Sequence, residues 1–439
     1  MGLFGKKKTQ KLTKAQNREA AEAEKKRQEE ELERIFNEGL AAYNANDYAK
    51  ALSMFEKAGR QGLTNAQFNC GVIYYDGIGT EEDKAKALYW YEKAAEQGDI
   101  KAQFNCGVMY CNGDGTTEDK AKALYWYEKA AEQGHVDAQF NCGVMYRMGE
   151  GTAEDREKSL YWYEKAAEQG HADAQYRCGG MYEDGMGTTV DKEKALYWYE
   201  KAAEQGYDRA QFTCGWMYDN GKGTAMDKAK ALYWYEKAAE QGHSSAQYEC
   251  GAMYREGKGT AADEKKALYW YEKAAEQGYT DAQFNCGTMY CNGEGTAEDK
   301  AKALYWYEKA AERGHIDAQF NCANMYAKGE GTAEDNALAL YWYEKAAKQG
   351  DADAQFICGF MYDLGKGTEE DKAEALYWFE KAAEQGNATA QYNCGLMYYR
   401  GEGTTVDSAK AKMWFQKAAD QTENKEVQEK VKEILREYF

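Results

Sequence analysis

Cysteine and histidine are the residues of this chain that offer nucleophilic or metal-binding chemistry, and both recur at a fixed spacing. Ten of the twelve cysteines lie 36 residues apart, from Cys70 to Cys394. The four histidines occupy one position of the same period: His135, His171, His243 and His315. One histidine per period does not bring together the several ligands that a zinc site needs. We therefore interpret the histidines as turn residues and predict no metal site.

Cys111 and Cys291 fall outside the 36-residue register. A nucleophilic cysteine needs a base beside it, and no histidine shares the local helix face. We interpret both as exposed, mildly reactive thiols. Three loops read G-K-G-T, but a phosphate-binding loop has Lys directly before Ser or Thr and follows a strand. The sequence therefore predicts neither catalysis nor a cofactor, although a hydrolase built on the repeat array, for example of the β-lactamase type, stays open as an alternative.

The elements that carry these residues belong to a repeating unit, AQFNCGVMYCNGDGTTEDKAKALYWYEKAAEQG at residues 102–134. A fixed period over most of a chain indicates a solenoid. In the copy at residues 63–98 we predict a first helix from about Asn65 to Tyr75. A glycine turn beginning at Gly77 ends it, and Asp83 caps a second helix that runs to about Gln97. We call these two helices the A helix and the B helix of a repeat.

The repeat pattern divides the chain into five parts. Residues 1–18 carry six basic residues and no acid, so the remainder carries a charge of −25. We expect them to form a disordered tail, because a myristoylated polybasic anchor would need Ser or Thr where Lys6 stands. Residues 19–34 read as a charged helical lead-in, 35–62 as a tetratricopeptide-like first repeat, 63–421 as ten 36-residue repeats, and 422–439 as a capping helix. The cap is expected from its apolar spacing: Val427, Val431, Ile434, Leu435 and Phe439.

Composition narrows the classes of partner. The net charge of −19 argues against nucleic-acid binding, which needs a basic surface. Residues 1–20 lack the apolar core of a signal peptide, and no apolar run approaches the length of a membrane span. Single, regularly spaced cysteines are too far apart to pair. We therefore expect a cytoplasmic protein without stable membrane insertion, and a monomer.

The motifs A-Q-x-x-C-G-x-M-Y, G-x-G-T and D-x-x-K-A-x-x-W-Y-x-K-A-A-x-Q-G resemble the Sel-1-like repeat family, a relative of the tetratricopeptide repeats. The likeness covers roughly residues 62–421. Two departures stand out: Cys70 and its equivalents replace the usual Leu, and Ala323 replaces the packing Gly. The resemblance implies an all-α fold, a right-handed solenoid superhelix of antiparallel helix pairs. It also implies a non-catalytic scaffold or adaptor in protein complexes.

Comparison of the copies shows where a specific surface would lie. Positions equivalent to 65, 69, 72 and 76 vary among the copies and follow i, i+4, i+7, i+11, a single stripe on the A helix. We predict that this stripe lines a concave groove and binds a peptide or protein partner. Asn amides both donate and accept hydrogen bonds, and aromatic residues anchor partner side chains. The candidate residues are Asn69, Val72, Asn105, Val108, Asn141, Val144, Arg177, Trp216, Arg255, Asn285, Asn321, Ile357, Phe360 and Asn393. Two alternatives are a solvated face that has drifted and a purely structural spacer without a ligand.

Overall fold

The computed structural model describes the backbone of residues 3–420 and 425–438 and the side chains of residues 16–420 and 428–437. Within these ranges the chain is entirely helical, with 23 α-helices and no strand, as the sequence predicts. The helices are α1 (Leu3–Asn44), α2 (Tyr48–Gly59), α3 (Thr64–Asp76), α4 (Lys84–Glu96), α5 (Ile100–Asn112), α6 (Lys120–Glu132), α7 (Val136–Met148), α8 (Arg156–Glu168), α9 (Ala172–Asp184), α10 (Lys192–Glu204), α11 (Asp208–Asn220), α12 (Lys228–Glu240), α13 (Ser244–Glu256), α14 (Glu264–Glu276), α15 (Thr280–Asn292), α16 (Lys300–Glu312), α17 (Ile316–Lys328), α18 (Asn336–Lys348), α19 (Ala352–Leu364), α20 (Lys372–Glu384), α21 (Ala388–Arg400), α22 (Ser408–Asp420) and α23 (Lys425–Tyr438).

Local chemistry sets the bounds of each helix pair. Gly77 ends α3 with a φ of 65°, a left-handed conformation that glycine adopts without strain. The Asp83 carboxylate accepts a hydrogen bond from the Lys86 amide at 2.9 Å and so caps α4. The predicted A and B helices are confirmed, and their bounds differ from the prediction by about one residue.

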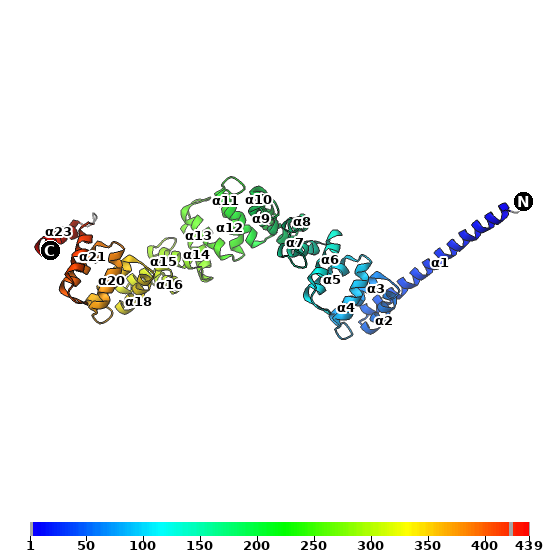
Figure 1. The fold of residues 1–439 in the computed structure, drawn as a ribbon, viewed down its shortest axis with the longest axis horizontal. Coiled ribbons are helices and arrows are strands. Elements are labelled where there is room, and N and C mark those ends of the chain that lie inside the picture. The colour runs from blue at the N-terminus through cyan, green and yellow to red at the C-terminus, as the bar shows by residue number, and fades with distance from the viewer. Residues whose placement is uncertain (1–2, 421–424, 439) are drawn as a thin grey trace. The chain divides into compact units, whose positions relative to one another are not determined.

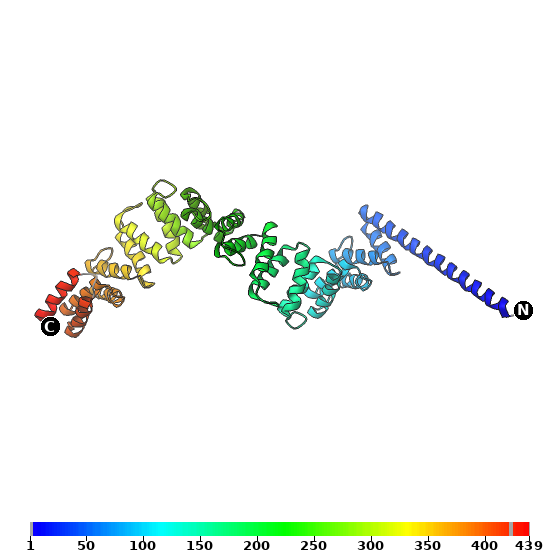
Figure 2. The ribbon, with the colours of Figure 1, turned by 90° about the horizontal axis from the view of Figure 1, so that it is seen from above.

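The A helices pack closely on their own B helices because the packing position is glycine, except in the repeat that has Ala323. A Cβ built on Gly71 would lie 2.5 Å from the Tyr91 ring, so this approach leaves no room for a side chain. Cys70 and Ala66 beside it are fully buried. The chain is therefore a solenoid of adjacent, paired helices within each of its parts (Figures 1 and 2).

Polar bonds join successive repeats. Gln67 of α3 donates to the Gly59 carbonyl of the preceding repeat at 2.8 Å, and it accepts a hydrogen bond at 2.7 Å from Gln97, which follows α4 in its own repeat. The Tyr110 hydroxyl of α5 donates to Glu92 of α4 at 2.5 Å. Since Gln67 and Tyr110 are buried, their pairing stabilises a regular stack that apolar contacts alone would leave less defined.

Contacts divide the chain into two compact units. The first comprises residues 1–210 and 222–224, and the second comprises residues 211–221 and 225–439. In the first unit, the early part of α1 projects away from the helix pairs, and residues 16–31 are exposed (Figure 1).

The described backbone of residues 3–18 belongs to α1, where the sequence analysis expects a disordered tail. Good helix formers such as Lys, Gln, Ala and Leu fill this segment, and proline is absent. The helix then continues without a break through the charged lead-in.

The last helix, α23, packs against α22 and α21 in the second unit. Its Val431 is fully buried, while Lys432 and Glu433 beside it face solvent. This is the contact expected of an end cap, although Phe439 and the side chain of Val427 lie outside the described residues. None of the described helices is both long and apolar enough to cross a bilayer.

Candidate functional site

The variable stripe lies on the solvent-facing side of the A helices, between the buried Gln and Cys positions. Arg177, Trp216 and Phe360 are exposed, and the other predicted stripe residues are half-buried. The stripe residues of the first unit lie on α3, α5, α7 and α9, and those of the second on α11, α13, α15, α17, α19 and α21. The predicted residues thus fall into two sets, each of which lines its own unit.

The first unit has two adjoining cavities on this stripe. A cavity of about 270 Å³ lies between α1 and α3, and one of about 320 Å³ lies between α3 and α5. Their linings share Val72. The first is lined by Leu40, Tyr43, Phe55, Phe68, Asn69, Val72 and Ile73. The second is lined by Val72, Tyr75, Asp76, Tyr91, Phe104, Asn105, Val108 and Met109. Each cavity therefore has mainly apolar walls and one asparagine.

Two asparagines of this unit, Asn105 and Asn141, affect the pKa of a tyrosine on the preceding B helix. Burial raises the pKa of Tyr91, the Asp76 charge adds to the rise, and a hydrogen bond with the Asn105 side chain opposes it. Burial likewise raises the pKa of Tyr127, and an interaction with Asn141 opposes that rise. An amide has two donor hydrogens and an acceptor oxygen, so one bond to a hydroxyl leaves polar capacity for a ligand.

A smaller cavity, of about 120 Å³, lies on the stripe of the second unit. Its lining combines the apolar Phe360, Phe379 and Leu396 with Asn393 and the charged Asp363, Arg400 and Glu402. The Phe360 ring stands edge-on to Phe379, with ring centres 6.1 Å apart. Phe379 occupies the position of Tyr91, so this floor has no hydroxyl.

Two predicted residues differ in what surrounds them. Trp216 is 40% exposed on α11. Arg255 is already engaged, because its guanidinium donates to Glu294 of the next repeat at 2.8 Å. Arg255 also lies one position before the stripe, in the register of Tyr75. Trp216 thus presents part of its indole to solvent, whereas Arg255 links neighbouring repeats.

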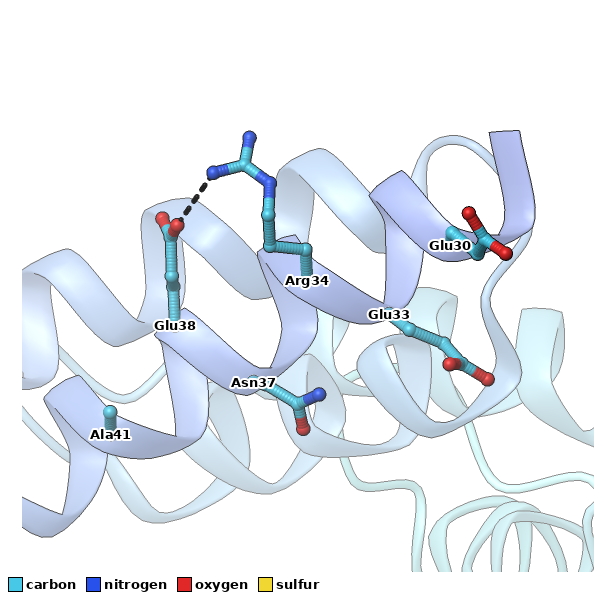
Figure 3. A pocket seen from close by; sticks show the side chains of 6 residues that line it. All are labelled: Glu30, Glu33, Arg34, Asn37, Glu38 and Ala41. Carbon is cyan, nitrogen blue, oxygen red and sulfur yellow. Dashed lines mark hydrogen bonds and ion pairs between the residues drawn. The ribbon is translucent and has the colours of Figure 1, made fainter. Parts of the chain in front are cut away.

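Residues of the first repeat also line this surface, and the sequence analysis omits them. A Cβ on Gly39 would lie 2.7 Å from the Phe55 ring, as a Cβ on Gly71 would from Tyr91, so the two glycines are equivalent. Asn37 and Leu40 therefore correspond to Asn69 and Val72. The step of 32 residues from Gly39 to Gly71 would have located them. Figure 3 shows the exposed Asn37 amide on a different side of α1 from the Arg34–Glu38 ion pair, whose atoms are 2.9 Å apart.

The histidines and the two cysteines outside the register are not arranged as a catalytic site. His135 caps α7 by accepting a hydrogen bond from the Ala138 amide at 3.3 Å, which confirms its role as a turn residue. Cys111 has a neighbour that the sequence analysis did not predict: the Lys120 ammonium lies 3.2 Å from its Sγ, and Lys300 lies equally close to Cys291. Among the described residues, no group of three His, Cys, Asp or Glu side chains is arranged to hold a metal ion.

The Sel1 repeat family model matches eleven successive segments of the sequence: 36–63, 64–99, 100–135, 136–171, 172–207, 208–243, 244–279, 280–315, 316–351, 352–387 and 388–422. The chain belongs to the Sel1 repeat family. The first of these segments is the stretch that the sequence analysis interprets as a plain tetratricopeptide-like unit. The family assignment agrees with the resemblance drawn from the repeated motifs.

Solved structures support the same assignment. A protective antigen present in uropathogenic Escherichia coli strains, which displays an SLR fold, is 35% identical; the match covers 87% of this chain and 90% of that chain, with a TM-score of 0.61. A Sel1 repeat protein from Oxalobacter formigenes is also 35% identical, with coverage of 69% and 88% and a TM-score of 0.55. No curated protein matches the chain. The Sel1 repeat architecture is that of a scaffold suited to protein–protein interaction.

Proposed function

We propose that this Sel1 repeat protein is a non-catalytic, monomeric scaffold that binds a segment of a partner protein in a groove along the A-helix stripe. One observation carries the proposal. Positions that vary among the copies, such as those of Val72, Asn105 and Val108, are accessible and line a cavity together with constant residues such as Phe104 and Met109. The stacking of repeats requires the constant residues, and a ligand is a reason for the variation.

Charge and cysteine chemistry support the choice of partner and compartment. The net charge of −19 favours a protein over a nucleic acid, whose phosphates would be repelled. The twelve cysteines are free, which supports a reducing compartment.

The test is a selection from a displayed library of random linear peptides on the immobilised full-length chain. Binding of selected peptides is then measured on a stripe variant, Asn69→Ala, Asn105→Ala, Trp216→Ala and Asn285→Ala combined. The control variant, Glu157→Ala, Glu193→Ala and Lys265→Ala, changes exposed positions of B helices. We expect the stripe variant to lose binding at least about tenfold and the control to keep it. Equal binding by both variants, or no enrichment at all, contradicts a role for the stripe.

A further inference from the structure

The stripe is uniform in the first four repeats and irregular afterwards. Asparagine occupies one position of α1, α3, α5 and α7, and an aliphatic residue lies three positions later in each. The pairs are Asn37 and Leu40, Asn69 and Val72, Asn105 and Val108, and Asn141 and Val144. The next two repeats have Arg177 with Gly180 and Thr213 with Trp216. The uniform pairs all belong to the first unit, which also holds the two stripe cavities that share Val72.

The two cavities are large enough to take side chains from a ligand. An apolar cavity of about 150 Å³ holds a benzene-sized group, and these measure about 270 and 320 Å³. Val72 borders both, so groups that fill them would lie on either side of this one residue. A ligand with two large apolar side chains therefore matches the pair of cavities better than a ligand with one.

The asparagines supply hydrogen-bond donors and acceptors for a peptide main chain. A peptide in extended conformation presents unpaired N–H and C=O groups, and an asparagine side chain can satisfy one of each. The Asn105 and Asn141 side chains are half-buried, so part of their freedom is already restricted, which reduces the conformational entropy that binding would cost. Main-chain recognition of this kind does not depend on the ligand's sequence, which fits a row of identical residues.

One acidic residue adds a charge requirement. Asp76 borders the second cavity and is exposed. Among the residues with described side chains, no cation lies within ion-pair distance of it. The neighbouring Asp114 is different, because Lys84 holds it at 2.8 Å. A lysine or arginine of the ligand could form an ion pair with Asp76.

We propose that α1, α3, α5 and α7 hold an extended, basic–apolar segment of a partner protein. Two large apolar side chains of that segment enter the cavities on either side of Val72. Its main chain runs along Asn37, Asn69, Asn105 and Asn141, and a basic side chain meets Asp76. This inference rests on the proposed function and narrows it to one unit and one class of ligand.

The experiment uses the full-length chain and synthetic copies of the peptides selected from the random library. Three variants alter the proposed site: Asn69→Ala with Asn105→Ala and Asn141→Ala, Val72→Phe, which narrows both cavities, and Asp76→Asn. The matched control removes stripe asparagines of the second unit, Asn285→Ala with Asn321→Ala. Circular dichroism confirms that each variant folds. Binding is read by fluorescence anisotropy at two salt concentrations.

We expect the selected peptides to share two large apolar residues and at least one lysine or arginine. The asparagine set and Val72→Phe should each weaken binding about tenfold or more, and Asp76→Asn should weaken it and reduce its salt dependence. The control should bind within about twofold of the unaltered chain.

Other outcomes overturn the inference. Binding that is lost in the second-unit control and kept in the first-unit variants refutes the location while the proposed function stands. Binding that survives in both sets refutes the groove as well. Selected peptides without a basic residue refute the class of ligand. A dimer of the unaltered chain that Val72→Phe dissolves, seen by sedimentation, would assign the surface to a second copy.

Discussion

Histidine at the start of an A helix serves as a capping residue, and this makes a titratable group part of the fold. The neutral His135 Nδ1 accepts the Ala138 amide hydrogen at 3.3 Å, and its ring stacks on Phe104 with centres 4.4 Å apart. Burial lowers the pKa of His135, and the Asp137 charge opposes this effect. The cap thus requires the uncharged ring.

The sign of the pH effect follows directly. With a folded pKa below the unfolded value of about 6.5, His135 contributes stability above that pH and loses it as the pH falls through the lower folded value. We expect His135→Ala to cost about 1 kcal/mol at neutral pH. His135→Asp should restore the cap and keep it under mild acid, because Asp99 and Asp351 cap the same position at 2.8 and 2.6 Å. Thermal melts at pH 5 and 7.5 test this; equal melting of both variants would exclude a capping role.

The two cysteines outside the register are a second residue-scale case. Cys111 and Cys291 are half-buried, and the ten register cysteines are buried. Lys120 and Lys300 lie 3.2 Å from the two outer sulfurs, where Lys228 instead pairs with Asp219 at 2.8 Å. Access governs the reaction of a thiol with a bulky disulfide reagent.

We therefore expect two of the twelve thiols to react rapidly in the folded chain and the rest only after unfolding. The double variant Cys111→Ser, Cys291→Ser should remove the rapid phase, while Cys142→Ala should leave it unchanged. The measurement is the absorbance of released thiolate over time. Rapid reaction of more than two thiols would mean that the helix pairs open readily.

At the scale of the element, the close packing of the A helix on its B helix requires a small residue at the packing position. A Cβ on Gly107 would lie 2.5 Å from the Tyr127 ring. Ala323 shows what an extra methyl requires: the Phe320 and Tyr343 rings there meet at 72°, against 48° for Phe104 and Tyr127. The Tyr343 hydroxyl then donates to Asn324 at 2.7 Å. The copy that contains Gly107 has no such partner, because the equivalent position there is Val108.

Gly107→Ala should accordingly destabilise the chain. Overpacking costs about 1–3 kcal/mol, and the better helix propensity of alanine returns about 1 kcal/mol, so a net loss of up to about 2 kcal/mol is expected. In Ala323→Gly, the relief of crowding and the loss of alanine's helix propensity oppose each other. Its free energy of unfolding should therefore change by less than about 1 kcal/mol. Urea unfolding of the two variants compares them. A stabilised Gly107→Ala would show that the ring moves without cost.

The sequence predicts most of these elements because each rests on local chemistry repeated ten times. Gly77 and Asp83 set helix ends through their own backbone and side chain, so the bounds could be read directly. The bonds between repeats could not: Tyr110 reaches Glu92 across 18 residues, and only the packed structure shows how close these atoms lie. The cavities beside Val72 are gaps left by side-chain packing. The sequence spacing of the variable positions therefore locates the stripe but does not locate the cavities. For residues 1–18, the basic run and the mismatch of Lys6 with an anchor motif led to the prediction of a disordered tail, whereas helix propensity agrees with the helical backbone of α1.

At the scale of the whole molecule, the Tyr–Glu bond recurs between successive repeats. Tyr74 donates to Glu56 at 2.7 Å, and Tyr254 and Tyr290 make the same contact with Glu236 and Glu272 at 2.5 Å. Burial, and then the hydrogen bond to Glu56, raise the pKa of Tyr74 to about 12. The unfolded residue ionises near pH 10, so each such tyrosine stabilises the fold below that pH and loses its contribution as the pH approaches 12.

We therefore expect a steep loss of stability between about pH 10 and 12, in both units, because the bond occurs in each. Thermal melts followed with tyrosinate absorbance measure it. The variants Tyr110→Phe and Tyr254→Phe, one in each unit, should each reduce the alkaline loss slightly. Tyrosinate that forms near pH 10 without unfolding would show that these hydroxyls are free.

Stability in a repeat array is a sum of repeat and interface contributions, so damage at one end should stay local. Val431 is fully buried where α23 covers α22 and α21. An unpaired buried charge costs on the order of 3 kcal/mol, so Val431→Asp should release α23 rather than bury the carboxylate. Hydrogen exchange is then expected to accelerate in α21 and α22 while α3–α10 keep their protection.

Lys432→Asp, which alters an exposed neighbour, is the control and should exchange like the unaltered chain. Faster exchange in α3–α10 would instead mean that the array unfolds as one cooperative block, in which case the cap stabilises every repeat equally.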